Sequence, residues 1–484
     1  MFLGIDLGTS EVKLLLLDKG GSVVGQAGAA LDLQRPQPLW SEQDPAAWWR
    51  ATGTAVATLR ERHAQAWPLV SAIGLSGQMH GAVLLGGGDE VLRPAILWND
   101  GRSHAECAEL EAAAPRLHDI AGNLAMPGFT APKLLWVRRH EPEIFARVKT
   151  VLLPKDWLRL QLCGDKVSDP SDAAGTLWLD VARRDWSDEL LAACGLTRAQ
   201  MSRLVEASEP SGVLKPELAR AWGLGPEVVI AGGAGDNAAS AIGIGTVAPG
   251  DGFISLGTSG VLFVVNDRFA PNPASAVHAF CHALPQRWHQ MSVMLSAASC
   301  LRWFCTLVGS DEATLLAELS PDDSAVIDLA PIFLPYLAGE RTPHNDPFAP
   351  GVFFGLTPAS NRAACTYAVL EGVAFGLADG LDALRAAGTE VSTLSLVGGG
   401  ARSAYWAQLI ADALGVDILV HAGSEAGGAL GAARLAWLAA GGQVDAVCTR
   451  PAVAARHRPN PERHARLTPR LARFRDLYRR LRGA

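Results

Sequence analysis

Short apolar runs that end in glycine-containing loops recur along the chain and predict the strands of an α/β protein. The runs are Val70–Leu75, Val228–Ala231 and Leu394–Val397, and each leads directly into such a loop. Residues with helical spacing follow the last run, so strands alternate with helices. We expect α/β halves with mainly parallel sheets and short mixed edges.

The segment after Leu394–Val397 carries clear helix signals. Ser403 is a suitable N-cap, and Gly415 is a suitable C-terminal stop. The apolar residues between them recur at helical spacing: Trp406, Leu409, Ile410, Ala413 and Leu414. The sequence therefore predicts a capped helix immediately after the glycine loop Gly398–Ala401.

Two apolar patterns in the chain resemble each other. Phe2–Leu17 reads FLGIDLGTSEVKLLLL, and Gly252–Val265 reads GFISLGTSGVLFVV. At an offset of 249 residues the shared positions of the first copy are Ile5, Leu7, Gly8, Thr9, Ser10 and Val12. Each copy is an apolar run, a Gly-Thr-Ser turn and a second apolar run, which is typical of a hairpin. We predict two α/β halves, residues 1–245 and 246–484, divided in the Gly/Pro-containing stretch Gly245–Gly252.

The C-terminal stretch Arg456–Ala484 differs in charge from the rest of the chain. It carries ten arginines against Glu462 and Asp476. Its apolar residues fall at helical spacing: Leu467, Leu471, Phe474, Leu477, Tyr478 and Leu481. The pattern favours an amphipathic basic helix that docks on an acidic body, with membrane or nucleic-acid contact as the alternatives.

Composition narrows the class of protein. The 484 residues are 49% hydrophobic and 19% charged, which excludes wholesale disorder, and a net charge of −7 gives no reason to expect a nucleic-acid partner. None of the eight cysteines forms a CxxC pair, which favours reduced thiols in a cytosol. No secretory leader pattern is visible, and no apolar run approaches the roughly 18 residues of a membrane span. We expect a cytoplasmic enzyme without membrane contact.

The first Gly-Thr-Ser turn suits phosphate chemistry. Thr9 and Ser10 offer backbone N–H groups and hydroxyls that can surround phosphate oxygens. Asp6, at the end of the preceding strand, can hold Mg²⁺, usually through water. Lys13 on the returning strand could reach a transferring phosphoryl group. Turn chemistry alone also explains this short motif, but the second Leu-Gly-Thr-Ser at 256–259 favours two phosphate-facing hairpins around one nucleotide.

Asp236 follows an apolar run within Gly-Ala-Gly-Asp-Asn. A carboxylate on a glycine loop at a strand end can accept the proton of an attacking hydroxyl in phosphoryl transfer. An Asp-Asn turn without chemistry is the alternative. The stretch also fits G-x-G-x-x-A, but Asp236 would then lie inside the pyrophosphate loop and repel it, so we set the dinucleotide interpretation aside.

Two further loops carry candidate ligands. Gln78, Met79 and His80 supply an amide, an apolar contact and an imidazole, which suits a polyol, although a lone histidine is often structural. The loop Gly398–Ala401 would let a base or ribose lie against the backbone, with a tight strand–helix crossing as the alternative. The spaced pair His278 and His282 lacks the glutamate of a zinc-protease helix, and the chain contains no P-loop.

An ordered set of short motifs extends from end to end of the chain. They are Gly4–Ser10, Leu39–Asp44, Gly77–Gly81, Ile96–Arg102, Gly128–Trp136, Leu153–Asp156, Gly235–Ala239, Ser255–Gly260, Gly339–His344 and Gly398–Ser403. In this order they resemble the FGGY carbohydrate kinases of the actin-like ATPase superfamily, and within that family the bacterial members that phosphorylate D-xylulose. The resemblance implies an α/β fold of two ribonuclease-H-like domains with an interdomain cleft.

The resemblance also implies residue roles. Asp236 matches the family's catalytic base, and Asp6 matches its metal-associated aspartate, so both would face Mg²⁺. The sugar side corresponds to Gln78, Met79, His80, Asp236 and Asn237. The ATP side corresponds to Thr9, Ser10, Lys13, Thr258, Gly399, Gly400 and Ala401. Glycerol kinases carry Arg-Glu where this chain has Met79 and His80, which argues against glycerol as the substrate.

The implied reaction is ATP-dependent phosphorylation of D-xylulose at its C5 hydroxyl, with a sugar side in residues 1–245 and a nucleotide side in residues 246–484. A homodimer is a family expectation. One alternative is a kinase for another ketose or polyol, such as ribulose or gluconate. A second alternative, from a different class, is a non-catalytic actin-like sugar sensor, which would have no need of a base at Asp236.

Overall fold

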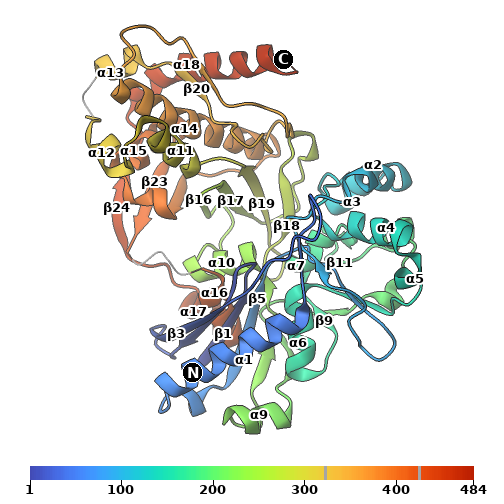
Figure 1. Cartoon of the computed structure of the whole chain (residues 1–484). Coiled ribbons are helices and arrows are strands. Elements are labelled where there is room, and N and C mark those ends of the chain that lie inside the picture. The colour runs from blue at the N-terminus through green and yellow to red at the C-terminus, as the bar shows by residue number, and fades with distance from the viewer. Residues whose placement is uncertain (321–323, 423–426, 484) are drawn as a thin grey trace.

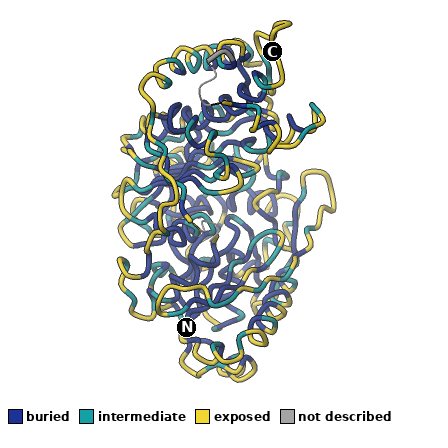
Figure 2. Tube along the Cα trace, turned by 90° about the vertical axis from the view of Figure 1, so that its left-hand side faces the viewer, coloured by how far each residue is buried: buried dark blue, intermediate teal, exposed yellow. Residues whose placement is uncertain are grey.

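Two seven-stranded sheets organise the protein. The computed structural model describes residues 1–320, 324–422 and 427–483, and each sheet forms the centre of one body of the molecule (Figure 1). Buried residues concentrate along the middle of both bodies, and exposed residues follow the outer helices and loops (Figure 2). The fold is two-domain α/β, as the sequence predicts.

The first sheet is built around the N-terminal hairpin. Its strands, in spatial order, are β13 (Pro210–Val213), β14 (Val229–Ala231), β5 (Ala72–Gly77), β1 (Phe2–Leu7), β2 (Glu11–Leu17) and β3 (Val23–Ala30), and β15 (Ala234–Gly235) continues beside β5. Helix α1 (Pro45–Arg62) packs against β2 and β3, whereas α16 (Gly428–Ala439) packs against β1 and β5. The carboxyl ends of β1, β5 and β15 therefore meet at one edge of the sheet.

Helix α16 comes from the far end of the chain yet lies on the first sheet (Figure 1). Glycines permit this approach: a Cβ on Gly4 would lie 2.0 Å from the Ala429 carbonyl oxygen, and one on Gly74 would lie 1.9 Å from that of Ala432. Helix α10 (Asp236–Ile244) packs against the same helix. The division at residue 245 stays a prediction, and no sequence signal indicated that α16 would pack on the first sheet.

The second sheet is built around the second hairpin. Its strands, in spatial order, are β18 (His278–Cys281), β19 (Trp288–Met294), β17 (Gly260–Asn266), β16 (Gly252–Leu256), β22 (Thr393–Val397), β23 (Asp417–His421) and β24 (Val453–His457). Its helices include α11 (Ala298–Val308), α14 (Arg362–Ala386), α15 (Ala404–Leu414) and α18 (Pro461–Leu481). Among the described residues α14 is long and apolar enough to cross a membrane, but 94% of its apolar window is buried, as in a core helix.

The prediction of mainly parallel sheets is wrong. In the second sheet only β16–β22 and β22–β23 are parallel, and in the first sheet antiparallel pairs flank the parallel pairs that involve β5. The reason is that each repeated hairpin contributes its own antiparallel pair, β1–β2 or β16–β17, and extends to further antiparallel neighbours. Parallel pairing occurs where longer connections link the strands.

Both predicted helix patterns are confirmed. The Ser403 hydroxyl accepts a hydrogen bond from the Trp406 N–H at 3.2 Å, and Gly415 ends α15 with φ at 66°. In α18, Phe474 is fully buried and stacks edge-on against Phe375. Its arginines pair with acidic residues of the same domain, as Arg470 does with Glu371, so the basic helix docks on an acidic surface. Ala484 lies outside the described residues.

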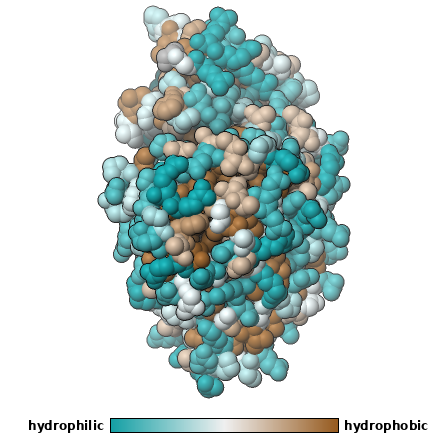
Figure 3. Space-filling view, turned by 90° about the vertical axis from the view of Figure 1, so that its right-hand side faces the viewer, coloured by the Kyte–Doolittle hydropathy of each residue, from teal (hydrophilic) through white to brown (hydrophobic). Residues whose placement is uncertain are grey.

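A third cluster of helices extends from the first domain (Figure 1). It contains α2 (His104–Ala113), α3 (Leu117–Ala121), α4 (Thr130–His140), α5 (Pro142–Phe145), α7 (Pro170–Ala173) and α8 (Asp188–Ala193). Its core is shared with β18 of the second sheet, because Phe129 and Phe280 belong to one buried cluster. On the corresponding face of the molecule apolar side chains gather near the middle, flanked by polar ones (Figure 3).

The remaining elements are short or connect these layers. The helices are α6 (Pro154–Cys163), α9 (Pro216–Trp222), α12 (Glu312–Ala317), α13 (Ser324–Leu329) and α17 (Val444–Val447). The strands are β4 (Glu42–Gln43), β6 (Val83–Leu85), β7 (Ala95–Ile96), β8 (Thr150–Leu152), β9 (Val167–Ser168), β10 (Leu179–Asp180), β11 (Asp185–Trp186), β12 (Arg203–Leu204), β20 (Ile332–Leu334) and β21 (Val352–Phe354).

Candidate active site

Asp6 lies at the carboxyl end of β1, where the parallel register places it beside Ser76 of β5. The Ser76 hydroxyl donates a hydrogen bond of 2.7 Å to Asp6 Oδ1. Burial raises the pKa of Asp6, while this hydrogen bond and the Lys13 charge oppose the shift. A Cβ on Gly428 would lie 2.7 Å from Asp6 Oδ1, so the N-terminus of α16 approaches the carboxylate as closely as only glycine allows.

Asp236 is the first residue of α10, directly after β15. The backbone N–H and the side-chain amide of Asn237 donate to Asp236 Oδ1 at 2.8 and 2.9 Å. Burial, and after it the negative charge of Asp6, raise the pKa of Asp236 to about 7. A carboxylate with this pKa is suited to take up a proton near neutral pH.

A buried polar network supports the loop that carries Asp236. The Gly235 N–H donates to the Ser171 hydroxyl at 3.3 Å, and Ser171 donates to Asp169. The Lys155 ammonium, fully buried, lies 2.9 Å from Asp169 and 2.6 Å from Asp156. Sequence reasoning missed this network, although Lys155 and Asp156 belong to one of the motifs that carry the family resemblance.

His80 stands next to this loop as a neutral hydrogen-bond acceptor. Its Nδ1 lies 2.7 Å from the Gly175 carbonyl oxygen, so Nδ1 carries the proton and Nε2 is the acceptor. Burial lowers the pKa of His80 to about 3, which keeps the ring uncharged. The backbone has φ at 68°, and Thr130 and Lys133 donate to the His80 carbonyl at 3.0 and 2.9 Å.

Met79 and Gln78 have different surroundings. Met79 is buried, and a Cβ on Gly235 would lie 2.8 Å from its Cγ, so it packs beside the base-bearing loop. Gln78 is also buried, and its Oε1 accepts from the Thr9 hydroxyl at 3.0 Å. The same hydroxyl accepts from Trp98 Nε1 at 3.0 Å. Gln78, predicted on the sugar side, thus contacts Thr9 in the turn predicted to bind phosphate. Sequence reasoning did not single out Trp98 as a partner of this turn.

The other turn residues are more open. Ser10 and Thr258 are exposed, and the Thr258 carbonyl accepts from the Ser299 hydroxyl at 2.7 Å. Lys13 pairs with Asp6 in the hairpin register, and its exposed ammonium lies 2.7 Å from Glu11. Within the described residues no cluster of three or more His, Cys, Asp or Glu could hold a metal by itself.

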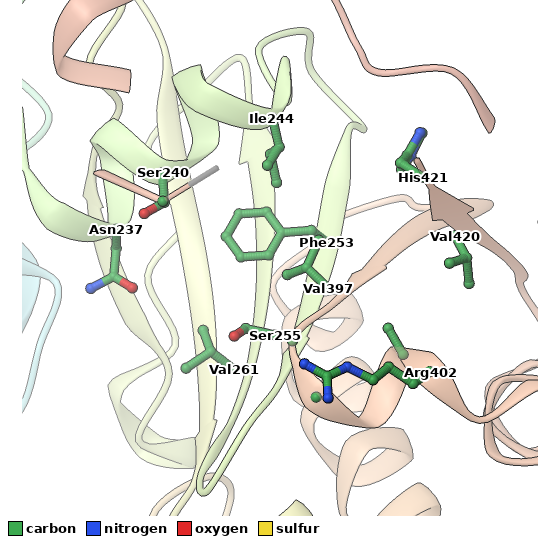
Figure 4. Close-up of a pocket in the computed structure, with 14 residues that line it drawn as sticks. Asn237, Ser240, Ile244, Phe253, Ser255, Val261, Val397, Arg402, Val420 and His421 are labelled. Atoms are coloured by element: carbon green, nitrogen blue, oxygen red, sulfur yellow. The ribbon is translucent and has the colours of Figure 1, made fainter. Parts of the chain in front are cut away.

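A cleft of about 520 Å³ opens between α10 and the second sheet (Figure 4). Figure 4 shows Asn237 and Ser240 on one side, Arg402 and His421 on the other, and Phe253 between them. Its full lining is Asn237, Ser240, Ile244, Phe253, Ser255, Val261, Val397, Gly398, Gly399, Ala401, Arg402, Val420, His421 and Gly427.

The predicted glycine loop forms part of this cleft. Gly399 and Ala401 line it, whereas Gly400 is buried behind them, where a Cβ would meet the Leu256 side chain at 2.4 Å. Asn237 connects the cleft to Asp236. The cleft therefore extends from the predicted nucleotide loop to Asn237, which donates hydrogen bonds to the Asp236 carboxylate. Sequence reasoning missed Arg402, although it belongs to the motif Gly398–Ser403, and it missed His421, which belongs to none of the motifs.

Two family models divide the chain between them. The N-terminal domain of the FGGY family of carbohydrate kinases matches residues 1–243, and its C-terminal domain matches residues 252–440. The chain belongs to the FGGY family of carbohydrate kinases. It is therefore a sugar kinase, with ATP as the co-substrate that the family implies, and the alternative of a non-catalytic sensor is set aside.

Individual relatives agree over the full length. The chain is 54% identical to a xylulose kinase of Escherichia coli (strain K12), with 99% of each protein covered. A crystal structure described as that of a "xyloylose kinase" from Brucella ovis is 52% identical, has a TM-score of 0.96 and covers 100% of this chain and 99% of its own. A xylulose kinase from Rhodospirillum rubrum is 28% identical, with a TM-score of 0.90 and 99% of each chain covered.

Proposed function

We propose that the protein transfers the γ-phosphoryl group of ATP to the C5 hydroxyl of D-xylulose, giving D-xylulose 5-phosphate and ADP. The observation that carries the proposal is the position of Asp236: its neighbour Asn237 lines the glycine-containing cleft, and its neighbour Gly235 packs against Met79, which precedes the neutral acceptor His80. The full-length similarity to xylulose kinases supports the choice of sugar.

Asp236 acts as the base in this proposal. Asn237 holds its Oδ1, so the other carboxylate oxygen can take the proton of the C5 hydroxyl as that oxygen attacks the γ-phosphorus. The new C5–O–P bond forms while the bond between the γ-phosphorus and the β–γ bridging oxygen breaks, and ADP leaves. His80 Nε2 accepts from a sugar hydroxyl, and Met79 lies against the apolar face of the sugar.

The phosphates lie between the two hairpin turns. Thr9 and Ser10 offer backbone donors on one side and Thr258 offers them on the other, where they stabilise charge on the moving phosphoryl group. Lys13 adds positive charge on the side of Asp6. The ribose and adenine lie along Gly399, Gly400 and Ala401 in the cleft. This arrangement assigns most of the catalysis to positioning and electrostatics.

Mg²⁺ fits the carboxylate pair. Asp6 and Asp236 interact electrostatically and offer hard oxygen ligands. Two carboxylates are few ligands, which suits Mg²⁺ because this ion keeps most of its water and also binds substrate phosphates. When bound there, Mg²⁺ would supply charge neutralisation for the β- and γ-phosphates. The proposal also retains the division at residue 245 and a cytoplasmic homodimer, both of which rest on the sequence and the family resemblance.

A substrate panel tests the proposed reaction. ADP release would be measured with ATP, Mg²⁺ and equal concentrations of D-xylulose, D-ribulose, L-ribulose, gluconate and glycerol. We expect D-xylulose to give the highest kcat/KM by at least about tenfold, and mass spectrometry to identify the 5-phosphate. A higher kcat/KM for ribulose or gluconate would transfer the reaction to that sugar and contradict the proposal.

The raised pKa of Asp236 predicts the pH dependence. Since the base must be deprotonated and its pKa is about 7, log kcat/KM should rise with unit slope below that pH and level off above it. Burial and the charge of Asp6 cause this shift, whereas an ordinary aspartate near pKa 4 would give a flat profile from pH 6 to 9. Because Mg²⁺ bound beside a carboxylate lowers its pKa, the profile would be recorded with ATP and Mg²⁺ below saturation, where kcat/KM reports the free enzyme, and a flat result would contradict the assignment.

A further inference from the structure

Arg341 of the second domain reaches the surroundings of His80 through a fixed hydrogen-bond relay. Asn123 donates its amide to the carbonyls of Ala121 and Ala279, so its Oδ1 must accept, and His278 Nδ1 lies 3.2 Å from it. His278 Nδ1 therefore carries the proton. Its Nε2 is then free to accept from the Arg341 guanidinium, which lies 3.4 Å away.

This relay lies near His80, which the proposed function places on the sugar side of the site. The Phe129 ring stands edge-on to His80 at 4.6 Å and to His278 at 5.7 Å between ring centroids. The positive charge of Arg341 contributes, after burial, to the lowered pKa of both histidines, so it lies near both. Met79 packs beside Gly235, next to the base, and contacts continue from its neighbour His80 through Phe129 to His278 and Arg341.

The Arg341 guanidinium has Glu340 as its neighbouring acidic group, whose charge opposes the lowering of the Arg341 pKa but which forms no ion pair with it among the described residues. The Arg341 side chain is partly buried, and burial lowers its pKa. Within the described part of the chain its guanidinium donates a hydrogen bond to neutral His278 and forms no ion pair. The neighbouring Glu340 carboxylate accepts the backbone N–H groups of Leu295 and Arg341 instead. Burying a charge with most of its donors unfilled is costly unless a ligand completes them.

We propose that Arg341 is a specificity-determining residue that binds the ketone end of the sugar. This inference rests on the proposed function. With C5 at Asp236, an extended ketopentose directs its C2 carbonyl oxygen and C1 hydroxyl oxygen toward Arg341. Two adjacent oxygen acceptors suit the planar fork of a guanidinium. A polyol that is reduced at C2 offers the same chain length without the carbonyl.

The test compares Arg341→Gln and Arg341→Lys with wild type and with Arg302→Gln, a matched control at an exposed arginine of the same domain. Steady-state ADP release would be measured with D-xylulose and with xylitol. We expect Arg341→Gln to raise the KM for D-xylulose about 30-fold, with kcat within about threefold. The preference for D-xylulose over xylitol should fall by about tenfold or more, and Arg341→Lys should recover part of it.

A second readout separates binding from turnover. D-xylulose without ATP should raise the Tm of wild type and Arg302→Gln but not of Arg341→Gln. An unchanged KM in a folded Arg341→Gln variant, or equal losses with D-xylulose and xylitol, would overturn the inference. If the wild type does not phosphorylate D-xylulose, the proposed function is wrong. The inference about Arg341 is tested separately by the Tm: it is wrong if D-xylulose stabilises the wild type and Arg341→Gln equally.

Discussion

Replacing Asp236 by asparagine should lower kcat for D-xylulose phosphorylation by about 10³-fold and change KM by less than about threefold. The amide keeps the shape of the carboxylate and can still be held by Asn237, but it cannot accept the proton of the C5 hydroxyl. A loss confined to kcat is the signature of an interaction made in the transition state. Single-turnover and steady-state ADP release would both report it.

The control for this substitution is Asp267→Asn, at an exposed aspartate of the second domain. It removes one carboxylate without touching the cleft, so its kcat should match wild type. The rise of activity with pH around 7 should also disappear in Asp236→Asn, since the titrating group is gone. A kcat within tenfold of wild type, or a retained pH dependence in the residual activity, would show that another group is the base.

Local sequence signals correctly predicted two kinds of element, the hairpins and a capped helix. The two hairpins formed where apolar runs flank Gly-Thr-Ser, and α15 begins and ends at its predicted cap residues. Asp6 and Asp236 were predicted to act together, and they do interact electrostatically. They do so because the carboxyl ends of β1 and β15 lie at the same edge of one sheet, beside β5, whereas the shared role at Mg²⁺ that the family resemblance implies stays a prediction.

What the sequence left undetermined depends on contacts between distant segments. Helix α16 packs on β1 and β5 because glycines of these strands allow its backbone to come close. These contacts join segments more than half the chain apart, and no hydrophobic periodicity predicts them. The mix of parallel and antiparallel pairs likewise depends on which further strands pair with the edges of each hairpin, and these strands lie outside the hairpin's own sequence. The polar network around Lys155 was hidden because a buried lysine and its carboxylates look like surface residues in a sequence.

The electrostatics of the site follow from the same packing. Burial, and after it the Asp6 carboxylate at the same sheet edge, raise the pKa of Asp236, and burial of His80 keeps that imidazole uncharged. An uncharged imidazole can bind the sugar through a hydrogen bond without adding charge. Positive charge stabilises the transition state most when it lies near the transferring phosphoryl group. Arg341 is the exception, which is why it stands out as a candidate for recognising the sugar's ketone end.

Replacing Asp6 by asparagine should lower kcat by about 10²-fold and raise the Mg²⁺ concentration needed for half-maximal rate. The substitution removes a negative charge next to phosphates and metal, and it keeps an oxygen that Ser76 can still donate to. It should also shift the pH profile to lower pH, because the charge of Asp6 helps to raise the pKa of Asp236.

Two comparisons make the Asp6 result specific. Ser76→Ala removes the hydrogen bond to Asp6 but leaves the carboxylate, so it should cost far less than Asp6→Asn, about threefold in kcat. Mg²⁺ titrations of ADP release in both variants would distinguish loss of metal affinity from loss of local structure. An Asp6→Asn variant with normal Mg²⁺ dependence and an unshifted pH profile would place the metal elsewhere and would limit Asp6 to holding the end of β1 against β5.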